Sequence, residues 1–415
     1  MSSPHRLAPA FVLLVSCVAL TALMPAQSGA ADPAGPTVTV AAAGDISCPA
    51  DMTEAAAGEF DDPEVPMKEM RCQGERVDDL IAAADPDIVL ALGDLIQSQP
   101  STTRAYDDFD ATWGKLRGKI MPTIGNHDYL RQPDGSLAPS GYFDYWTNAG
   151  TPRWRIGAPD ASWSSWNTGT WHMVNLNSNC NRVDCTFSGP QLRWLLKDLK
   201  ANRQNPGTQC TMAYLHHPRF SAGIELGRTG DRMLLVNIWE LLYRYRVDVV
   251  VTGHQHFYQR YLPQDPDGEE DPSGLTQFIT GTGGASTFPT KDEDGNRARN
   301  SIFSKRGLGA TFFTLGPDSY SWEFRDIEGN VWDQSNGETP CHSPNEGADR
   351  RAPRIARYAA HMARMRHLDG RVRKLNQRIR KLTRRKAVNR RIRPLRVTLR
   401  KVTRVRAGYR VKTLY

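Results

Sequence analysis

Five short apolar segments of the sequence each end in residues that can bind a metal ion or carry a proton. The segments read "TVTVAAAGDIS", "PDIVLALGDLIQ", "KIMPTIGNHDY", "QCTMAYLHHPRF" and "VDVVVTGHQHFY". Carboxylate, amide and imidazole groups suit Mn, Fe, Zn or Co, and such a site needs no thiolate. The candidate groups in these five segments are Asp45, Asp94, Asn126, His127, Asp128, His216, His217, His254 and His256.

Amphipathic helical stretches separate these segments, at about residues 76–84, 189–201 and 232–244. Buried strands that alternate with helices predict an α/β fold built on a sheet. In such sheets, functional groups gather beyond the carboxyl ends of the strands. We therefore expect the five segment ends to converge on one site. In the last segment, His254 and His256 are two residues apart, so an extended chain directs both to the same side.

In this order, "GDIS", "GDLIQ", "GNHD", "LHHP" and "GHQH" resemble the motifs of the calcineurin-like metallophosphoesterase superfamily. The match runs from about Ala41 to Gln259, and the chain is most similar to purple acid phosphatase-like secreted members. The resemblance implies an α/β sandwich of two mainly mixed β-sheets flanked by helices, spanning residues 36–334. The apolar runs that follow the last motif are expected to complete the second sheet.

The resemblance also implies a phosphoester hydrolase in which two metal ions share a bridging hydroxide. Their identity among Mn, Fe, Zn and Co stays open. The resemblance assigns six ligands by position: Asp94 bridges both ions, Asp45 and His256 hold the first ion, and Asn126, His216 and His254 hold the second.

Four further residues receive roles around the metal ions. By resemblance, His127 binds the phosphate or protonates the leaving oxygen, and Asp128 orients His127. We expect His217 and Arg219, which follow His216 closely, to face the substrate.

Two positions depart from the family pattern. Ser47 stands where members with a D-x-H motif have a histidine ligand, and Gln97 stands where purple acid phosphatases have a tyrosine ligand. The first metal ion therefore has fewer identifiable ligands than the second. Without that tyrosine, we expect no purple tyrosinate chromophore.

Three functions fit these residues. The first is a phosphomonoesterase that acts on a small phosphate ester. The second is a phosphodiesterase or nuclease that acts on a polyanion. The third is a non-catalytic, surface-bound scaffold with a degenerate metal site, since one ligand of the first ion is missing.

The amino terminus, residues 1–31, has the pattern of a secretory signal peptide. A basic start precedes an apolar run, and small residues near 28–30 offer a cleavage site. The apolar run is short for a membrane span, and we expect no transmembrane span in the mature chain. The sequence therefore predicts a protein that is secreted or associated with the cell surface.

Removal of this peptide leaves six cysteines. An even number in an exported chain indicates disulfide bonds, although six cysteines allow 15 pairings. Proximity in the sequence suggests Cys180–Cys185 and Cys48–Cys72, which leaves Cys210 and Cys341 as the third pair.

The net charge of +8 hides a strong asymmetry. Residues 351–415 contain 24 Lys and Arg and one acid, so they carry +23 and the rest of the chain carries −15. We expect a partly helical basic tail, joined to the main domain by a turn-rich linker at 335–350. The tail is either a solvated extension or an electrostatic anchor on anionic cell wall, lipid or nucleic acid.

Overall fold

The computed structural model describes residues 37–47, 73–97, 106–132, 134–223, 234–290 and 298–342, together with Lys374 and Gln377. The expected signal peptide, Cys48 and Cys72, and the rest of the basic tail lie outside the described residues. Every element named below belongs to the unit Gly35–Tyr415. No described helix has both the length and the hydropathy that a bilayer crossing requires.

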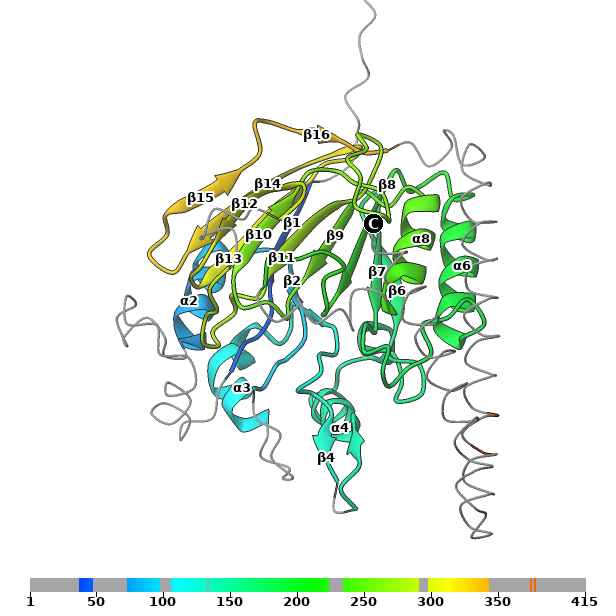
Figure 1. Cartoon of the computed structure of the whole chain (residues 1–415). Helices are drawn as coiled ribbons and strands as arrows, with labels where there is room; N and C mark the ends of the chain where they lie inside the picture. Colours follow the sequence, from blue (N-terminus) through cyan, green and yellow to red (C-terminus); the bar gives the residue numbers. More distant parts are fainter. Residues whose placement is uncertain are drawn as a thin grey trace, which may run out of the picture. The chain divides into compact units, whose positions relative to one another are not determined.

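Two seven-stranded sheets form the centre of the fold (Figure 1). The first runs in the order β15 (Val331–Gln334), β14 (Ser319–Asp326), β13 (Gly309–Leu315), β1 (Val38–Ala43), β2 (Ile88–Ala91) and β3 (Ile120–Pro122), with β16 (Thr339–Pro340) beside β14. The second runs β12 (Ser301–Lys305), β10 (Tyr258–Tyr261), β11 (Thr276–Thr280), β9 (Val249–Thr252), β8 (Cys210–Leu215), β7 (Trp171–Leu176) and β6 (Ser164–Thr168). A small hairpin joins β4 (Leu130–Arg131) to β5 (Leu137–Ala138).

Both sheets are mixed. Strands β1, β2 and β3 are parallel, as are β7, β8, β9 and β11, whereas the outer strands pair antiparallel. The predicted α/β sandwich of two mixed sheets is therefore confirmed.

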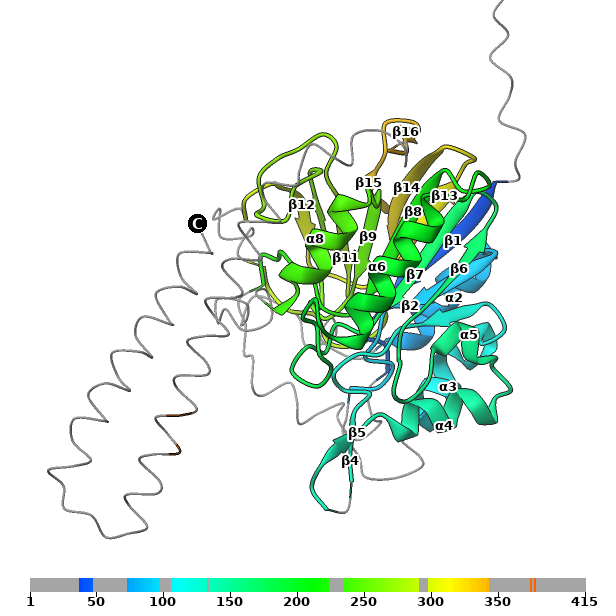
Figure 2. The ribbon, with the colours of Figure 1, turned by 90° about the vertical axis from the view of Figure 1, so that its right-hand side faces the viewer.

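Helices cover the outer face of each sheet. On the first sheet lie α2 (Gly74–Ala84), α3 (Asp107–Trp113), the short 3-10 helix η3 (Gly114–Leu116), α4 (Ser140–Asn148) and α5 (Arg153–Ile156). On the second lie α6 (Pro190–Asn202) and α8 (Val236–Arg244), which Figure 2 shows in front of their sheet.

Alternation along the central strands explains this layering. In β1, Ala41 and Ala43 pack with the helices of the first sheet, whereas Val40 and Ala42 face the core between the sheets. A stretch of strand with both faces buried must be apolar, as Val40–Ala43 of β1 are. The small alanine side chains also fit a strand that is covered on both sides.

One sequence expectation about the sheets is wrong. The strands after the last motif were expected to complete the second sheet, but β13, β14 and β15 join the first. The reason is that β2 occupies only one edge of β1, and β13 pairs antiparallel with the other edge. Of the strands that follow the last motif, β10, β11 and β12 belong to the second sheet.

The fold also extends beyond residue 334, into the segment expected to be a linker. Residues Thr339–Pro340 form β16, and Cys341 forms a disulfide bond with Cys210 at the start of β8. A second disulfide bond joins Cys180 to Cys185. Two of the three expected pairs are therefore present, and they tie one long and one short loop.

The two disulfide bonds should differ in their effect on stability. They join residues 131 and 5 positions apart. Loop-closure entropy gives a stabilisation of about 5 kcal/mol for the long loop and about 2 kcal/mol for the short one. Replacing Cys210 and Cys341 by alanine should therefore lower the free energy of unfolding more than replacing Cys180 and Cys185. Urea denaturation of both double variants measures the difference, and equal losses would contradict the prediction.

Candidate metal centre

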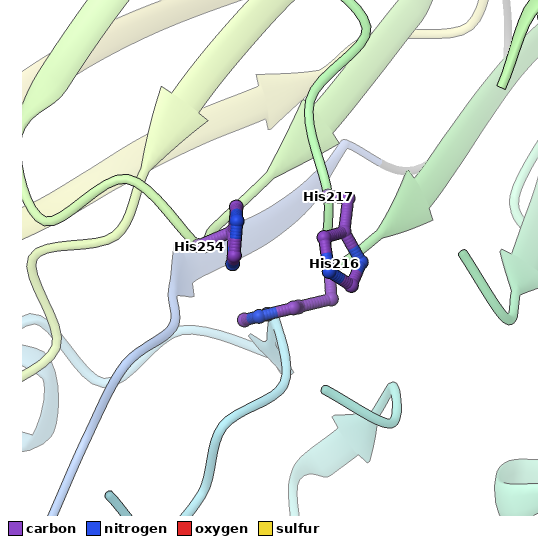
Figure 3. A group of neighbouring side chains, drawn as sticks. All are labelled: His216, His217 and His254. Atoms are coloured by element: carbon purple, nitrogen blue, oxygen red, sulfur yellow. The ribbon is translucent and has the colours of Figure 1, made fainter. Parts of the chain in front are cut away.

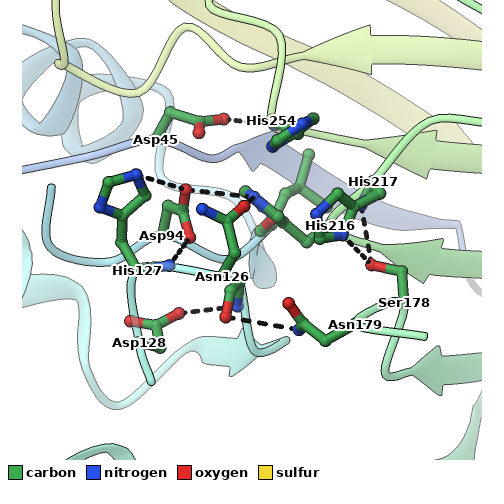
Figure 4. Close-up of polar contacts among 12 residues, drawn as sticks. Asp45, Asp94, Asn126, His127, Asp128, Ser178, Asn179, His216, His217 and His254 are labelled. Carbon is green, nitrogen blue, oxygen red and sulfur yellow. Dashed lines mark hydrogen bonds and ion pairs between the residues drawn. The ribbon is translucent and has the colours of Figure 1, made fainter. Parts of the chain in front are cut away.

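The five predicted segment ends meet where the two sheets approach each other (Figure 4). Backbone and side-chain hydrogen bonds hold them together. The N–H of His254, after β9, donates to Oδ2 of Asp45, after β1, at 2.7 Å. The N–H of His127 donates to Oδ1 of Asp94 at 2.7 Å. The site is therefore built from both sheets, at the carboxyl ends of their parallel strands.

Three of these residues have backbone conformations that are unusual for non-glycine residues. Asp45, Asp94 and His254 have φ angles of +60°, +47° and +69°. The left-handed region costs a non-glycine residue of order 1 kcal/mol, and such residues concentrate at functional sites. The strained turn directs each side chain back toward the space between the strand ends.

Two glycines permit this crowding. Gly93 has φ +84°, and a Cβ at this position would lie 2.8 Å from Nδ1 of His216. A Cβ on Gly125 would lie 2.1 Å from Oδ1 of Asp94. Glycine is required at both positions because no larger residue leaves room for the site residue beside it.

The ring of His216 is fixed by a backbone carbonyl group. Its Nδ1 donates to the oxygen of Leu92 at 2.9 Å, and its Nε2 lies 3.1 Å from Oδ1 of Asn126 and 3.2 Å from Oδ2 of Asp94. Burial disfavours the charged imidazolium, but the Asp94 carboxylate raises the pKa of His216 to about 9. The carbonyl bond directs Nε2 at the two oxygen ligands, which is how metal-binding histidines are held.

His256 is held in the same way. Its Nδ1 donates to the carbonyl oxygen of Ser286, and its ring stacks on Phe288 with the ring centres 4.2 Å apart. Its Nε2 lies 3.2 Å from Oδ1 of Asp45. His256 and Asp45 therefore lie side by side, and their shared role as ligands of one ion stays a prediction.

Three imidazoles pack against one another beside these pairs (Figure 3). The ring centres of His217 and His254 are 4.3 Å apart, and those of His216 and His254 are 5.1 Å apart. Burial and the neighbouring histidines lower the pKa of His254 to about 3 and hold that of His217 well below its usual value. Both rings are therefore neutral, and a neutral imidazole keeps a lone pair for a metal ion.

The two carboxylates at the centre are buried. Asp94 is 1% exposed and Asp45 is fully buried. Although burial opposes ionisation, His216, His127 and His254 lower the pKa of Asp94 below its usual value. Oδ1 of Asp45 forms no well-aligned hydrogen bond among the described residues, and its neighbour is Nε2 of His256 at 3.2 Å, so a cation between the two atoms would bind both.

These groups fit a metal centre. The ligand atoms of Asp45, Asp94 and His216 lie within 4.8 Å of one another, and so do those of His216, His217 and His254. The two sets share His216. Oxygen and nitrogen donors of this kind suit divalent transition metals. His217, which the sequence assigned to the substrate, lies as close to the other imidazoles as the predicted ligands do.

His127 and Asp128 lie in the turn after β3, near Asp94, but their side chains form no hydrogen bond with each other. The side chain of His127 is 34% exposed, and its Nε2 lies 3.9 Å from Oδ2 of Asp94. Asp128 is buried and accepts hydrogen bonds from the N–H groups of Gly125 and Leu95 and from the hydroxyl of Tyr106. Burial, with the Asp94 charge added, raises the pKa of Asp128 to about 7. Asp128 therefore shapes the loop and is not bonded to His127.

Arg219, expected at the substrate, is instead buried against the protein. It is 5% exposed, its guanidinium lies 4.7 Å from the ring centre of Phe220, and it donates to the carbonyl oxygen of Pro266. Through these contacts the Arg219 side chain joins the loop after β8 to the loop that contains Pro266. Its expected contact with the substrate stays a prediction.

The structure also shows the surroundings of Ser47 and Gln97, the two residues that depart from the family pattern. Ser47 donates its hydroxyl to the carbonyl oxygen of Leu95 at 2.6 Å, so it fastens two adjacent segments. Nε2 of Gln97 is buried, and no described residue provides it with a hydrogen-bond partner.

Several supporting groups could not be identified from the sequence. The carbonyl groups of Leu92 and Ser286 orient His216 and His256. Ser178 bonds to Nδ1 of His217 and accepts its backbone N–H, both at 2.8 Å. Asn179 donates to the carbonyl oxygen of Ile124, beside the "GNHD" turn. The one signal that could have indicated Ser178 and Asn179 is the polar stretch "NSN" (177–179) directly after β7.

A family model independently matches the same region. Residues 38–258 match the calcineurin-like phosphoesterase family, a range that contains every residue from Asp45 to His256. The chain therefore belongs to the calcineurin-like phosphoesterase family.

Within that family the chain is purple acid phosphatase-like. It is 28% identical over 227 residues to purple acid phosphatase 23 of Arabidopsis thaliana, a match that covers 48% of this chain and 47% of the relative. It is 23% identical over 220 residues to human acid phosphatase type 7, which covers 48% of each chain. The chain thus spans about half the length of the curated relatives it matches.

The fold has a counterpart among solved structures. The purple acid phosphatase PPD1 from yellow lupin (Lupinus luteus) seeds superposes with a TM-score of 0.56 at 19% identity, covering 73% of this chain and 54% of that one. This similarity supports the metallophosphoesterase fold.

Metal binding should depend on Asp94. The Asp94→Asn variant keeps the shape of the side chain but loses the negative charge beside His216 and His127. We expect its affinity for the metal ion to fall by about 10-fold to 100-fold. Elemental analysis after dialysis against buffered metal measures the bound ion. The matched control is Asp198→Asn, because the Asp198 carboxylate bonds to His172 and Ser165 and is not a predicted ligand. This control variant should keep its metal. Equal loss of metal in both variants would contradict a role for Asp94.

Proposed function

We propose that this protein is an exported, metal-dependent phosphomonoesterase with a dinuclear metal site. One observation carries the proposal: carboxylates and oriented imidazoles from five strand ends converge at the seam between the sheets. The family match supports hydrolysis of a phosphoric ester. The relatives with similar sequences include purple and other acid phosphatases, which favours a monoester as substrate.

In the proposed site, Asp94 would be shared by two sets of ligands. Asp45 and His256 would hold one ion, and Asn126, His216 and His254 would hold the other, with His217 next to His254. Bound metal ions would neutralise the phosphoryl charge and supply a hydroxide nucleophile at neutral pH. The chain's own part is to hold these ligands in place, with Nδ1 of His216 and of His256 fixed by carbonyl groups.

His127 is the candidate for proton transfer. Its side chain is 34% exposed, against 0% for His216 and 9% for His256, and its Nδ1 has no hydrogen-bond partner among the described residues. Its backbone is held by Asp94. From this position the imidazole would contact the phosphoryl group and donate a proton to the leaving oxygen.

Export is part of the proposal. The signal-peptide pattern at 1–31 and the two disulfide bonds favour an oxidising compartment outside the cytoplasm. The basic tail would then hold the enzyme on an anionic surface at the cell.

The first test of the proposed activity is a comparison of two esters. We expect the purified protein with added Mn²⁺ to hydrolyse p-nitrophenyl phosphate faster than bis(p-nitrophenyl) phosphate. Asp94→Asn should remove most of this turnover. Faster hydrolysis of the diester would indicate a phosphodiesterase, and no turnover of either ester with any metal would indicate the scaffold.

The second test concerns His127. His127→Ala should lower kcat for phenyl phosphate by about 100-fold or more, because its leaving group needs a proton. The loss should be smaller for p-nitrophenyl phosphate, whose leaving group is stable as an anion. Metal content, measured in parallel, should match the wild type. Equal losses for the two esters would contradict the role of His127 as an acid.

The tail gives a third test. Deleting 351–415 removes a charge of +23. We expect turnover of p-nitrophenyl phosphate to remain and retention on anionic vesicles or cell wall to fall, most clearly at low salt. If turnover disappears in a protein that is still folded by circular dichroism, the tail belongs to the catalytic domain.

A further inference from the structure

His217 lies among the proposed metal ligands, and its hydrogen bonds determine what it can do there. One of its ring nitrogens lies within 4.8 Å of the ligand atoms of His216 and His254. A ring nitrogen with a free lone pair can bind a metal ion, whereas a ring nitrogen that carries a proton can only donate a hydrogen bond. The position of the proton on the ring therefore decides between a metal ligand and a donor to the substrate.

Ser178, two residues after the end of β7, bonds to His217 twice. Its Oγ lies 2.8 Å from the backbone nitrogen of His217 and 2.8 Å from Nδ1 of the ring. A backbone N–H group can only donate, so Oγ accepts the first of these bonds. Ser178 is 4% exposed and His217 is 6% exposed, so both bonds are shielded from bulk solvent.

The bond to the ring uses the hydrogen of the Ser178 hydroxyl. Among the described residues, Nδ1 of His217 is the one acceptor that bonds to this hydroxyl. If Nδ1 carried the proton, Oγ would accept both bonds and the hydroxyl hydrogen would be buried without a partner, which is costly. Burial and the neighbouring histidines also hold the pKa of His217 well below its usual value, so the ring is neutral. A neutral ring that accepts at Nδ1 carries its proton on Nε2.

The two ring nitrogens of His217 face different sides. Figure 4 shows Ser178, which bonds to Nδ1, on the side of the ring away from His254. The other nitrogen faces His254 in Figure 3, and the centres of these two rings are 4.3 Å apart. Within the described part of the chain, His217 forms its hydrogen bonds with Ser178, and no described residue accepts from Nε2. The N–H group at Nε2 is therefore directed into the space beside the candidate ligands His216 and His254.

We propose that Ser178 keeps the proton of His217 on Nε2, and that this N–H group donates to an oxygen of the phosphoryl group at the metal centre. Ser178 is then a positioning residue, and His217 is a donor to the substrate and not a metal ligand. This inference rests on the proposed phosphomonoesterase function and gives the expected contact of His217 with the substrate a physical reason. A donor whose direction is fixed before the substrate binds stabilises the charge on the phosphoryl oxygens without reorganisation. The proton stays on Nε2, so proton transfer to the leaving oxygen remains with His127.

The first test locates the proton by nitrogen nuclear magnetic resonance of the protein labelled at its histidine nitrogens, without metal and with Zn²⁺. The variant His217→Gln identifies the signals of His217 by their loss. We expect the wild-type ring to show a protonated Nε2 and an unprotonated Nδ1 in both states. In Ser178→Ala the Nδ1 signal should shift, because the hydrogen bond from the hydroxyl is gone. A proton on Nδ1, or Zn²⁺ bound at Nε2, in the wild-type protein would overturn the proposal.

The second test measures what the Ser178 hydroxyl contributes to turnover. Ser178→Ala should lower kcat/KM for p-nitrophenyl phosphate by about 10-fold to 100-fold, the usual cost of losing a group that orients a site histidine. Ser178→Thr, which keeps the hydroxyl, should restore most of this loss. The matched control is Ser162→Ala, because the Ser162 hydroxyl is also buried but bonds to Asn177. This control should lose little turnover, and a Ser178→Ala protein as active as the wild type would show that the proposal is wrong.

Two measurements without turnover separate this inference from the proposed activity. His217→Gln, whose amide N–H group can replace the donor, should bind as much metal as the wild type, whereas Asp94→Asn should bind less. By calorimetry, metal-loaded Ser178→Ala should bind inorganic phosphate more weakly than the metal-loaded wild type does. If neither p-nitrophenyl ester is hydrolysed but the proton lies on Nε2 and phosphate binding depends on Ser178, the activity is wrong and the inference stands. If the esters are hydrolysed and His217→Gln loses its metal, His217 is a ligand and the inference is wrong.

Discussion

The candidate site depends on a contact between two sheets. His216, at the end of β8, donates from Nδ1 to the carbonyl oxygen of Leu92, which follows β2 in the other sheet, at 2.9 Å. The N–H of His254 completes the link by bonding to Asp45 at 2.7 Å. The candidate carboxylate ligands Asp45 and Asp94 follow strands of the first sheet, whereas the candidate imidazole ligands His216, His254 and His256 follow strands of the second. The site therefore forms only when the sandwich has closed, and any change that separates the sheets also separates the ligands.

This arrangement places charged groups where water is excluded. Asp45, Asp94 and His216 are all essentially buried, and isolated charges in such places are costly. The left-handed backbone at Asp45, Asp94 and His254 adds further cost. A fold tolerates such a cluster when the surrounding core is large, and two sheets with helices on both outer faces supply that core. Cations bound among these groups would offset the cost, which links the stability of this region to metal binding.

The sequence predicted the layers and the gathering of the strand ends, because both follow from local patterns. Apolar runs such as Val247–Val251 mark buried strands, and polar residues directly after them must lie at the sheet edge. It did not predict the contacts that depend on tertiary packing. The carbonyl partners of His216 and His256 leave no trace in side-chain type. The bonds of Asp128 to backbone N–H groups, and the burial of Arg219, likewise depend on loops whose path the sequence does not specify.

The segment between β11 and β12 shows how a loop can hold a site residue from two directions. The carbonyl group of Ser286 accepts from Nδ1 of His256, and the ring of Phe288 stacks on the imidazole. Thr287, between them, accepts a hydrogen bond from Arg306 in the turn between β12 and β13. This bond fixes the loop that orients His256. The direction of Nε2 therefore depends on a turn that the order of the motifs in the sequence does not reveal.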